Sequence, residues 1–313
     1  MALAFVFPGQ GSQRVGMGSS LAGAFTAARQ TFEEVDDALH DNLSRTIFDG
    51  PESDLTMTEN AQPALLAVSQ AVRRVIETEG GIGLASVSVF VAGHSLGEYS
   101  AIAAAGGLSL ADAVRLVRRR GRAMQDAVPV GDGAMAAILG LDIDAVTEIA
   151  SAAAGANVCA VANDNAPGQV VISGAAPAID RAILLAKERG ARRCVPLAVS
   201  APFHCQLMTP AAEVMAEALA EIELLDPTPA LVANVTAEPV EKAADIRRLL
   251  VEQITGRVRW RESVMAMKLA GVDKLVELGA GKVLTQMTRR IDPELKGVSV
   301  ETPEDVEGLL KTL

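Results

Sequence analysis

"VFVAGHSLGEYSA", residues 89–101, joins an apolar, β-branched run to residues that favour a helix. Between the two stands Gly93-His94-Ser95-Leu96-Gly97, which fits the G-x-S-x-G pattern of a nucleophile elbow. In that motif a sharp strand-to-helix turn pushes the serine hydroxyl out of the sheet, and glycines allow close packing on both sides. The motif predicts that Ser95 is a nucleophile; the alternative is a glycine-rich turn without chemistry.

The N-terminal part of the chain predicts an α/β core. Residues 2–7 and 86–92 have the apolar pattern of buried strands, and residues 63–77 and 110–125 have helical periodicity. Strands that alternate with helices in this way favour a mostly parallel sheet.

A second pattern begins near residue 128. Strands and helices are predicted there in the order β-α-β-β-α-β, which is the split ferredoxin-like motif. We expect a small inserted subdomain at residues 128–199 and a large catalytic domain formed by residues 1–127 and 200–313. The predicted elements are a strand at 133–141, a helix at 142–154, strands at 157–164 and 168–174, a helix at 176–189 and a strand at 192–199.

The composition of the 313 residues restricts the function. Half of the residues are apolar, so a sizeable core can be buried, and the net charge of −11 argues against a general nucleic-acid binder. Because Cys159, Cys194 and Cys205 form no C-x-x-C pair, we expect neither a zinc site nor disulfides, and we favour a reducing cytoplasm. The N-terminus lacks the basic region of a signal peptide, and no apolar run is long enough to span a membrane.

A serine nucleophile needs a base, and the chain has three histidines. His40 lies in a charged helical stretch, and His94 adjoins the serine at a turn where neighbouring side chains point in different directions. By elimination His204 is the candidate base, with a hydrogen-bonded core histidine as the alternative. No aspartate between Ser95 and His204 is an obvious orienting acid. A dyad oriented by a backbone carbonyl therefore fits the sequence as well as a triad does.

The helix predicted at residues 110–125 carries an arginine on its apolar face. At about 100° per residue, Arg120 falls among apolar residues that include Leu116 and Val117. A buried guanidinium is costly unless it is paired, so Arg120 needs either an internal carboxylate or an anionic ligand. The opposite face carries Arg115, Arg118, Arg119 and Arg122. That face is either ordinary solvated surface or a surface for an acidic partner.

Six motifs extend over nearly the whole chain. They are FPGQGSQ at 7–13, GHSLGEYSA at 93–101, the Arg120 helix, GQVVISG at 168–174, APFHC at 201–205 and QITGRVRW at 253–260. In this order they resemble the malonyl-CoA:acyl carrier protein transacylase family of bacterial fatty acid synthesis. The resemblance implies an α/β-hydrolase-like core with a mostly parallel sheet, plus an inserted ferredoxin-like subdomain. One departure is Arg257, which stands where the family pattern has proline.

The resemblance also implies a ping-pong transfer through a malonyl-serine ester. Ser95 would attack the thioester of malonyl-CoA, with His204 as base. The backbone N–H groups of Gln10 and Leu96 would form the oxyanion hole, and Arg120 would hold the free malonyl carboxylate. The phosphopantetheine thiol of acyl carrier protein would then accept the malonyl group, and no metal or other cofactor is needed.

Four further residues match positions near the family's site. Gln253 matches a glutamine whose backbone carbonyl region helps to orient the histidine, and Phe203 resembles the bulky residue of malonyl-preferring forms. Asn163 and Asn165 match a polar N-x-N before the Pro-Gly turn, and their roles follow only from the match.

An acidic chain needs a local basic patch to dock an acidic carrier protein. The candidates are Lys187, Arg189, Arg192 and Arg193 on the subdomain, and Arg118, Arg119 and Arg122 on the arginine helix. We expect a cytoplasmic monomer that binds neither nucleic acid nor membranes. The alternatives are a malonyl transferase of a malonate decarboxylase or polyketide system, a serine esterase or thioesterase, and a non-catalytic carrier-docking module.

Overall fold

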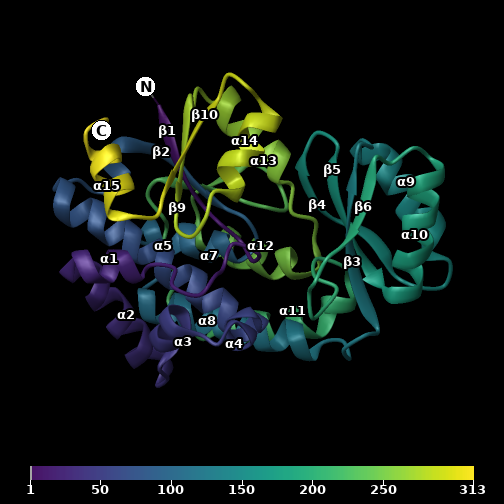
Figure 1. The fold of residues 1–313 in the computed structure, drawn as a ribbon, viewed down its shortest axis with the longest axis horizontal. Coiled ribbons are helices and arrows are strands. Elements are labelled where there is room, and N and C mark those ends of the chain that lie inside the picture. Colours follow the sequence, from purple (N-terminus) through teal and green to yellow (C-terminus); the bar gives the residue numbers. More distant parts are fainter. Residues whose placement is uncertain (1) are drawn as a thin grey trace.

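The computed structural model describes residues 2–313 and divides them between two sheets (Figure 1). The larger sheet has six strands in the order β10-β9-β1-β2-β7-β8, and all are parallel except β8, which pairs antiparallel with β7. This mostly parallel sheet confirms the predicted α/β core. Its strands are β1 (Leu3–Phe7), β2 (Ser88–Gly93), β7 (Ala230–Val232), β8 (Pro239–Val240), β9 (Lys274–Leu278) and β10 (Lys296–Val300).

Strand β1 is buried on both faces, as expected for a central parallel strand. Leu3, Phe5 and Phe7 pack in the larger hydrophobic core, whereas Ala4 and Val6 pack on the opposite face with residues of α13 and α14. The helices of this part are α1 (Ser19–Ala24), α2 (Thr26–Leu39), α3 (Leu43–Asp49), α4 (Glu52–Thr56), α5 (Thr58–Gly80), α6 (Leu84–Val87), α7 (Leu96–Ala104), α8 (Leu110–Asp126), α11 (Thr209–Ala220), α12 (Ala243–Thr255), α13 (Trp260–Leu269), α14 (Val283–Ile291) and α15 (Pro303–Leu310), with a 3₁₀ turn at Gln206–Met208.

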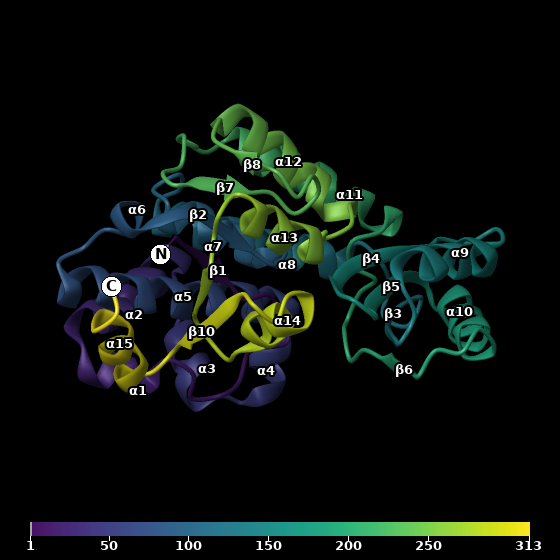
Figure 2. The ribbon, with the colours of Figure 1, turned by 90° about the horizontal axis from the view of Figure 1, so that it is seen from above.

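The second sheet forms a smaller unit at one end of the molecule, as Figure 2 shows from above. Its strands are antiparallel in the order β4-β5-β3-β6, and α9 and α10 pack on them through their own apolar cluster. The order β-α-β-β-α-β is the predicted ferredoxin-like one. The domain boundaries at residues 127/128 and 199/200 stay a prediction. The elements are β3 (Gly133–Leu139), α9 (Ile143–Ala154), β4 (Cys159–Ala166), β5 (Gln169–Ala175), α10 (Ala176–Glu188) and β6 (Arg193–Pro196).

The strand register brings three distant segments together at the carboxyl ends of neighbouring strands in the larger sheet. Phe7 of β1 pairs with Gly93 of β2, and β2 pairs on its other side with β7. All three strands are parallel, so their carboxyl ends lie together, where ligand sites of open α/β sheets form. Gln10, Ser95 and Asn234 each lie within three residues of one of these strand ends.

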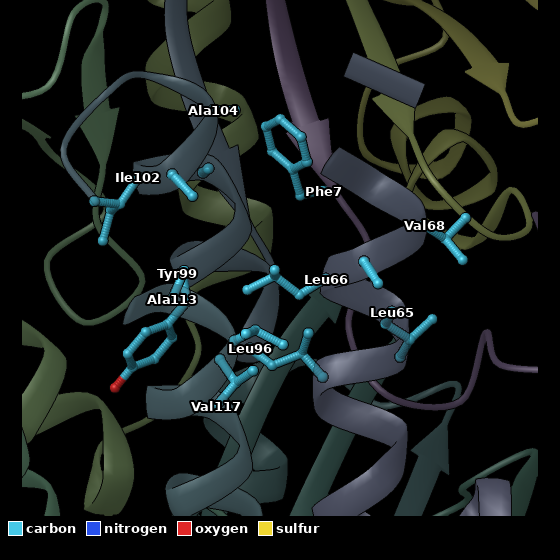
Figure 3. Packing of buried hydrophobic residues seen from close by; sticks show 14 of the residues in the cluster. Phe7, Leu65, Leu66, Val68, Leu96, Tyr99, Ile102, Ala104, Ala113 and Val117 are labelled. Carbon is cyan, nitrogen blue, oxygen red and sulfur yellow. The ribbon is translucent and has the colours of Figure 1, made fainter. Parts of the chain in front are cut away.

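The core behind these strand ends fixes the helix that carries Arg120. Figure 3 shows Phe7, Leu65, Leu96 and Val117 converging from β1, α5, α7 and α8. Each of these side chains is at most 1% exposed. Arg120 lies in phase with the apolar face of α8. Because this face packs into the cluster, the Arg120 side chain must also point inward.

Three features of the larger sheet and its helices differ from the sequence prediction. Residues 84–87 form the short helix α6, so the strand predicted at 86–92 begins only at Ser88. Helix α5 begins at Thr58, five residues before Pro63, so this proline lies inside the helix, where it removes one backbone donor, and does not mark the start of the helix. Strands β7, β8 and β10 are short or edge strands with weak patterns, and the sequence prediction missed them.

Candidate active site

The turn at Ser95 has the strained geometry expected of a nucleophile elbow. Ser95 has φ 54° and ψ −110°, a backbone conformation that L-residues rarely adopt. A Cβ atom on Gly93 would lie 1.9 Å from the carbonyl carbon of Gly97, and one on Gly97 would lie 2.2 Å from the carbonyl oxygen of Phe7. The two glycines are therefore needed so that strand β2, helix α7 and the end of β1 can pack closely.

His204 is hydrogen-bonded to the serine hydroxyl. Its Nε2 lies 2.8 Å from Ser95 Oγ, and its Nδ1 lies 2.9 Å from the backbone oxygen of Gln253. A carbonyl oxygen can only accept, so Nδ1 carries the proton and Nε2 of the neutral ring is free to take one from Ser95. Burial, and then the charge of Arg120, lower the pKa of His204 to about 3, which keeps the ring neutral near pH 7.

The orienting partner of His204 is thus a main-chain carbonyl. No carboxylate in the described residues forms a hydrogen bond with the ring. Of the two alternatives that the sequence left open, a triad and a dyad, the geometry is that of a Ser95–His204 dyad. His94 points elsewhere, as expected, and its Nε2 donates to Asn165 Oδ1 at 2.9 Å. His40 is exposed at the end of α2.

Arg120 is only 2% exposed, and its guanidinium group is bound by neutral oxygens. Nη1 donates to Gln62 Oε1 at 2.9 Å, and Nη2 donates to Gln253 Oε1 at 2.8 Å and to Ser95 Oγ at 3.0 Å. Its Nε finds no partner in the described structure. Within residues 2–313 Arg120 forms no salt bridge, so the buried cation is solvated by the protein but its charge is not neutralised by a contacting carboxylate.

Three polar residues behind the elbow were missed by the sequence analysis. Asn234 Oδ1 accepts from the Ser95 N–H at 2.8 Å, and its Nδ2 donates to Gly93 O at 2.7 Å. Glu98 accepts from Gln253 Nε2 at 2.5 Å, and burial raises the pKa of this carboxyl to about 8. The third is Gln62, which accepts from Arg120 Nη1. Only Glu98 had a signal in the sequence, because it is an acidic residue within α7, a helix whose residues are all buried.

A pocket of about 290 Å³ opens between the two parts of the molecule at Ser95. The backbone N–H groups of Gln10 and Leu96 face no acceptor among the described residues. Gln253 and Asn165 do not line the pocket but contact residues that do. The predicted site residues that line it are Gln10, Ser95, Leu96, Arg120, Asn163, Phe203 and His204.

The arginine helix differs from its predicted exposure at one position. Arg118 was expected on the outward face, but α8 packs against α2 and α5, and Arg118 is only 8% exposed. Its guanidinium group donates to Asn60 and, at 3.0 Å, to Asp41. Arg119 and Arg122 are paired with Glu221 and Glu59 at 3.1 and 2.6 Å. The positive charge of this arginine face is therefore largely neutralised by acidic residues of the protein itself.

The basic residues of the subdomain are exposed. Arg189 is paired with Glu148 at 2.7 Å. No ion pair is recorded in the described part of the chain for Lys187, Arg192 or Arg193, and all three are open to solvent. Arg257, the departure from the family pattern, lies 3.5 Å from Glu262.

A family model described as "Acyl transferase domain" matches residues 4–306. A relative named malonyl CoA-acyl carrier protein transacylase, from Bacillus subtilis (strain 168), is 46% identical over 312 residues, covering 99% of this chain and 97% of the relative. The chain belongs to the malonyl CoA-acyl carrier protein transacylase family. It is therefore an acyltransferase, and its site can be compared with those of solved family members.

Two solved structures of such acyltransferases superpose closely. The acyl-carrier-protein S-malonyltransferase from Bartonella henselae is 52% identical with a TM-score of 0.98, covering 100% of this chain and 99% of that one. A complex described as a type II PKS acyl-carrier protein with its malonyl-transacylase is 43% identical with a TM-score of 0.97, covering 100% of both chains. The acyltransferase fold thus extends over the whole chain.

The part of the chain that the structure describes has neither a membrane-spanning helix nor a cluster of metal ligands. No helix within residues 2–313 is long and apolar enough to cross a membrane. The same residues contain no group of three or more His, Cys, Asp or Glu side chains that could hold a metal ion.

Proposed function

We propose that this chain transfers the malonyl group from malonyl-CoA to the phosphopantetheine thiol of an acyl carrier protein, through a malonyl ester of Ser95. The product would supply fatty acid synthesis. The observation that carries the proposal is the buried guanidinium group of Arg120, which lies 3.0 Å from Ser95 Oγ and whose hydrogen-bond partners among the described residues are all neutral. A site of this kind suits an acyl group with a carboxylate at its free end.

In the first half-reaction Ser95 Oγ attacks the thioester carbonyl while His204 Nε2 takes its proton. The negative charge that develops on the carbonyl oxygen is bound by the N–H groups of Gln10 and Leu96, the latter at the positive end of α7. The intermediate collapses, the C–S bond breaks, and CoA leaves with the proton from His204. Arg120 binds the free malonyl carboxylate throughout.

In the second half-reaction the carrier thiol replaces CoA. His204 takes the proton of this thiol, the sulfur attacks the ester carbonyl, and the C–O bond to Ser95 breaks. His204 then returns the proton to Ser95 Oγ. Each step moves one proton between His204 and a nucleophile or leaving group, so the proposed reaction uses no metal and no redox cofactor.

The remaining site residues have supporting roles in this proposal. Gln253 orients His204 through its backbone oxygen and Arg120 through its side chain. Phe203 narrows the pocket beside the acyl group. Asn165 holds His94, and Asn163 lines the pocket from β4.

A simple esterase is the main alternative of another class, and Arg120 argues against it. Such an enzyme gains nothing from a desolvated cation at the nucleophile, which costs stability unless an anionic ligand binds it. A malonyl transferase of a polyketide or malonate decarboxylase system uses the same chemistry and differs only in the carrier that it serves.

The proposal also covers the surface that docks the carrier protein, the oligomeric state of the enzyme and its location in the cell. Lys187, Arg192 and Arg193 form the basic patch for an acidic carrier protein, and their exposure supports this role. In this proposal the chain acts as a monomer, because all residues of the proposed reaction come from one chain and no second copy is needed. Its location is the cytoplasm, where malonyl-CoA is available.

The direct test is intact mass spectrometry of the protein mixed with malonyl-CoA. We expect a malonyl adduct on Ser95 that disappears when carrier protein with a free phosphopantetheine thiol is added, and no adduct on Ser95→Ala. Loss of the adduct to water at the same rate with and without the carrier would instead support a thioesterase.

A further inference from the structure

Glu98 is a buried acid at the nucleophile elbow that does not line the pocket. It lies in the first turn of α7, three residues after Ser95, and is 1% exposed. Its Oε2 accepts from Gln253 Nε2 at 2.5 Å, and both carboxyl oxygens lie 3.4 Å from the backbone nitrogen of Asn234. In the described structure these neighbours are both donors, and no cation contacts the carboxyl group.

The side-chain amide of Gln253 connects this carboxyl to the active-site cation. Nε2 donates to Glu98 and, at 2.9 Å, to the backbone oxygen of Ser95, whereas Oε1 accepts from Arg120 at 2.8 Å. The reversed amide would place an NH₂ group against the donors of Arg120, and an oxygen against the Glu98 carboxyl and the Ser95 carbonyl. Glu98 therefore favours the one orientation that presents an acceptor to Arg120.

The consequence for Arg120 follows from its small set of partners. Gln62 and Gln253 supply its two fixed acceptors, and Ser95 Oγ is itself the reacting atom. If the amide of Gln253 turned over, Arg120 would lose one of the two acceptors and face a donor. The guanidinium group would then move away from the place where the acyl carboxylate has to bind.

We propose that Glu98 is a positioning residue that sets the preference for malonyl over acetyl groups by fixing the side-chain amide of Gln253 against Arg120. This inference rests on the proposed function. Glu98 touches neither the substrate nor Ser95 Oγ in this role. Its effect should therefore appear in selectivity between acyl groups rather than as a uniform loss of activity.

The test compares the rates at which malonyl-CoA and acetyl-CoA acylate Ser95 in Glu98→Gln and wild type. Glutamine has nearly the same shape, but its NH₂ group must face either Gln253 Nε2 or the backbone nitrogen of Asn234, which are both donors. The comparison is made above pH 8, because the pKa of Glu98 is about 8 and its carboxyl group must be ionised to accept from both. We expect the malonyl-over-acetyl ratio to fall about 10-fold or more. Glu98→Asp, which withdraws the carboxyl by one methylene, should lower the ratio in the same direction.

The matched control is Glu277→Gln in β9. Glu277 is also a fully buried acid surrounded by donors, since it accepts from the backbone N–H groups of Leu284 and Thr285. It does not contact the site. Its substitution should affect the thermal midpoint of unfolding but leave the acyl ratio unchanged, which separates positioning from general loss of stability.

A double-mutant cycle with Gln253→Ala tests the route of the effect. This substitution removes the amide but keeps the backbone oxygen that holds His204. If Glu98 acts through Gln253, Glu98→Gln should change the ratio little further in this background. An unchanged ratio in Glu98→Gln and Glu98→Asp, or an effect that adds fully to that of Gln253→Ala, would overturn the inference. Absence of any malonyl adduct on the wild type would instead overturn the proposed function.

Discussion

Arg120 Nη2 lies 3.0 Å from Ser95 Oγ, so the buried cation contacts the same hydroxyl as His204. This closeness limits the acyl group. In a malonyl ester only one methylene separates the ester carbonyl from the free carboxylate, so that carboxylate can reach only a cation beside the nucleophile. A longer diacid would extend its carboxylate past Arg120, and an acetyl group would leave the cation without an anionic partner.

The first prediction concerns the pH dependence set by His204. Its pKa is lowered from 6.5 to about 3, so the base stays neutral in mild acid. We expect kcat/KM for malonyl-CoA to stay constant from about pH 7 to about pH 5, when corrected for unfolded protein. A decline centred near pH 6.5 that belongs to the free enzyme would contradict this environment for His204.

The same pKa shift affects stability. Because the pKa of folded His204 lies below its unfolded value, the unfolded chain binds a proton between pH 6.5 and about 3 that the folded chain does not. The free energy of unfolding should therefore fall as the pH falls through this window, by up to about 1.4 kcal/mol per pH unit from this residue. His204→Asn tolerates the positive φ of 58° and should reduce this slope.

The second prediction concerns the elbow. In Gly97→Ala the new Cβ would lie 2.2 Å from the carbonyl oxygen of Phe7, and only backbone movement can relieve that contact. Urea denaturation should show a loss of about 3 kcal/mol or more in the free energy of unfolding. The control is Gly308→Ala in α15, where a Cβ meets no atom within 4 Å and alanine should stabilise by about 0.5–1 kcal/mol. Equal stability of the two variants would rule out the packing explanation.

Two central residues of the site could be predicted from local signals. Ser95 lies in a motif with a defined backbone shape, and Arg120 breaks the phase of an amphipathic helix. His204 has no local signal and was found by elimination, which was possible because the chain has only three histidines. The structure brings all three to one hydroxyl oxygen.

The supporting residues could not be predicted, because their roles depend on contacts between distant segments. Gln62 was missed because Pro63 was taken as the start of its helix, and Asn234 follows the short strand β7, which has little pattern. Arg118 was predicted to lie on the exposed face of its helix, but the structure buries it. Helical phase tells which residues share a face, but not that Asp41 and Asn60 from neighbouring segments cover it.

The third prediction concerns acyl size. Phe203 is 8% exposed and lines the pocket, so its ring limits the room for a branch on the acyl group. We expect Phe203→Ser to raise transfer of methylmalonyl relative to malonyl groups, and Phe203→Leu, which keeps most of the volume, to change this ratio much less. A serine variant that prefers malonyl as strongly as wild type would exclude Phe203 as a determinant of size.

The fourth prediction concerns carrier docking. Reversing the charge of Arg192 and Arg193 together should raise KM for the carrier protein more than KM for malonyl-CoA, and the effect should weaken as salt is added. A matched double reversal is available at Lys296 and Lys311, which are exposed near β10 and α15, away from the subdomain (Figure 1). Equal increases in both KM values for the Arg192 and Arg193 variant would refute the patch.

The most direct test of the account is the competition between malonyl-CoA and acetyl-CoA for Ser95, measured by intact mass in wild type and Arg120→Ala. Arg118→Ala serves as the control, since it removes an arginine of the same helix that binds Asp41 instead of the site. We expect the preference for malonyl to fall about 100-fold or more in Arg120→Ala, with acetylation retained or increased, and to stay unchanged in the control. An unchanged preference in Arg120→Ala would contradict the assignment of this cation to the acyl carboxylate.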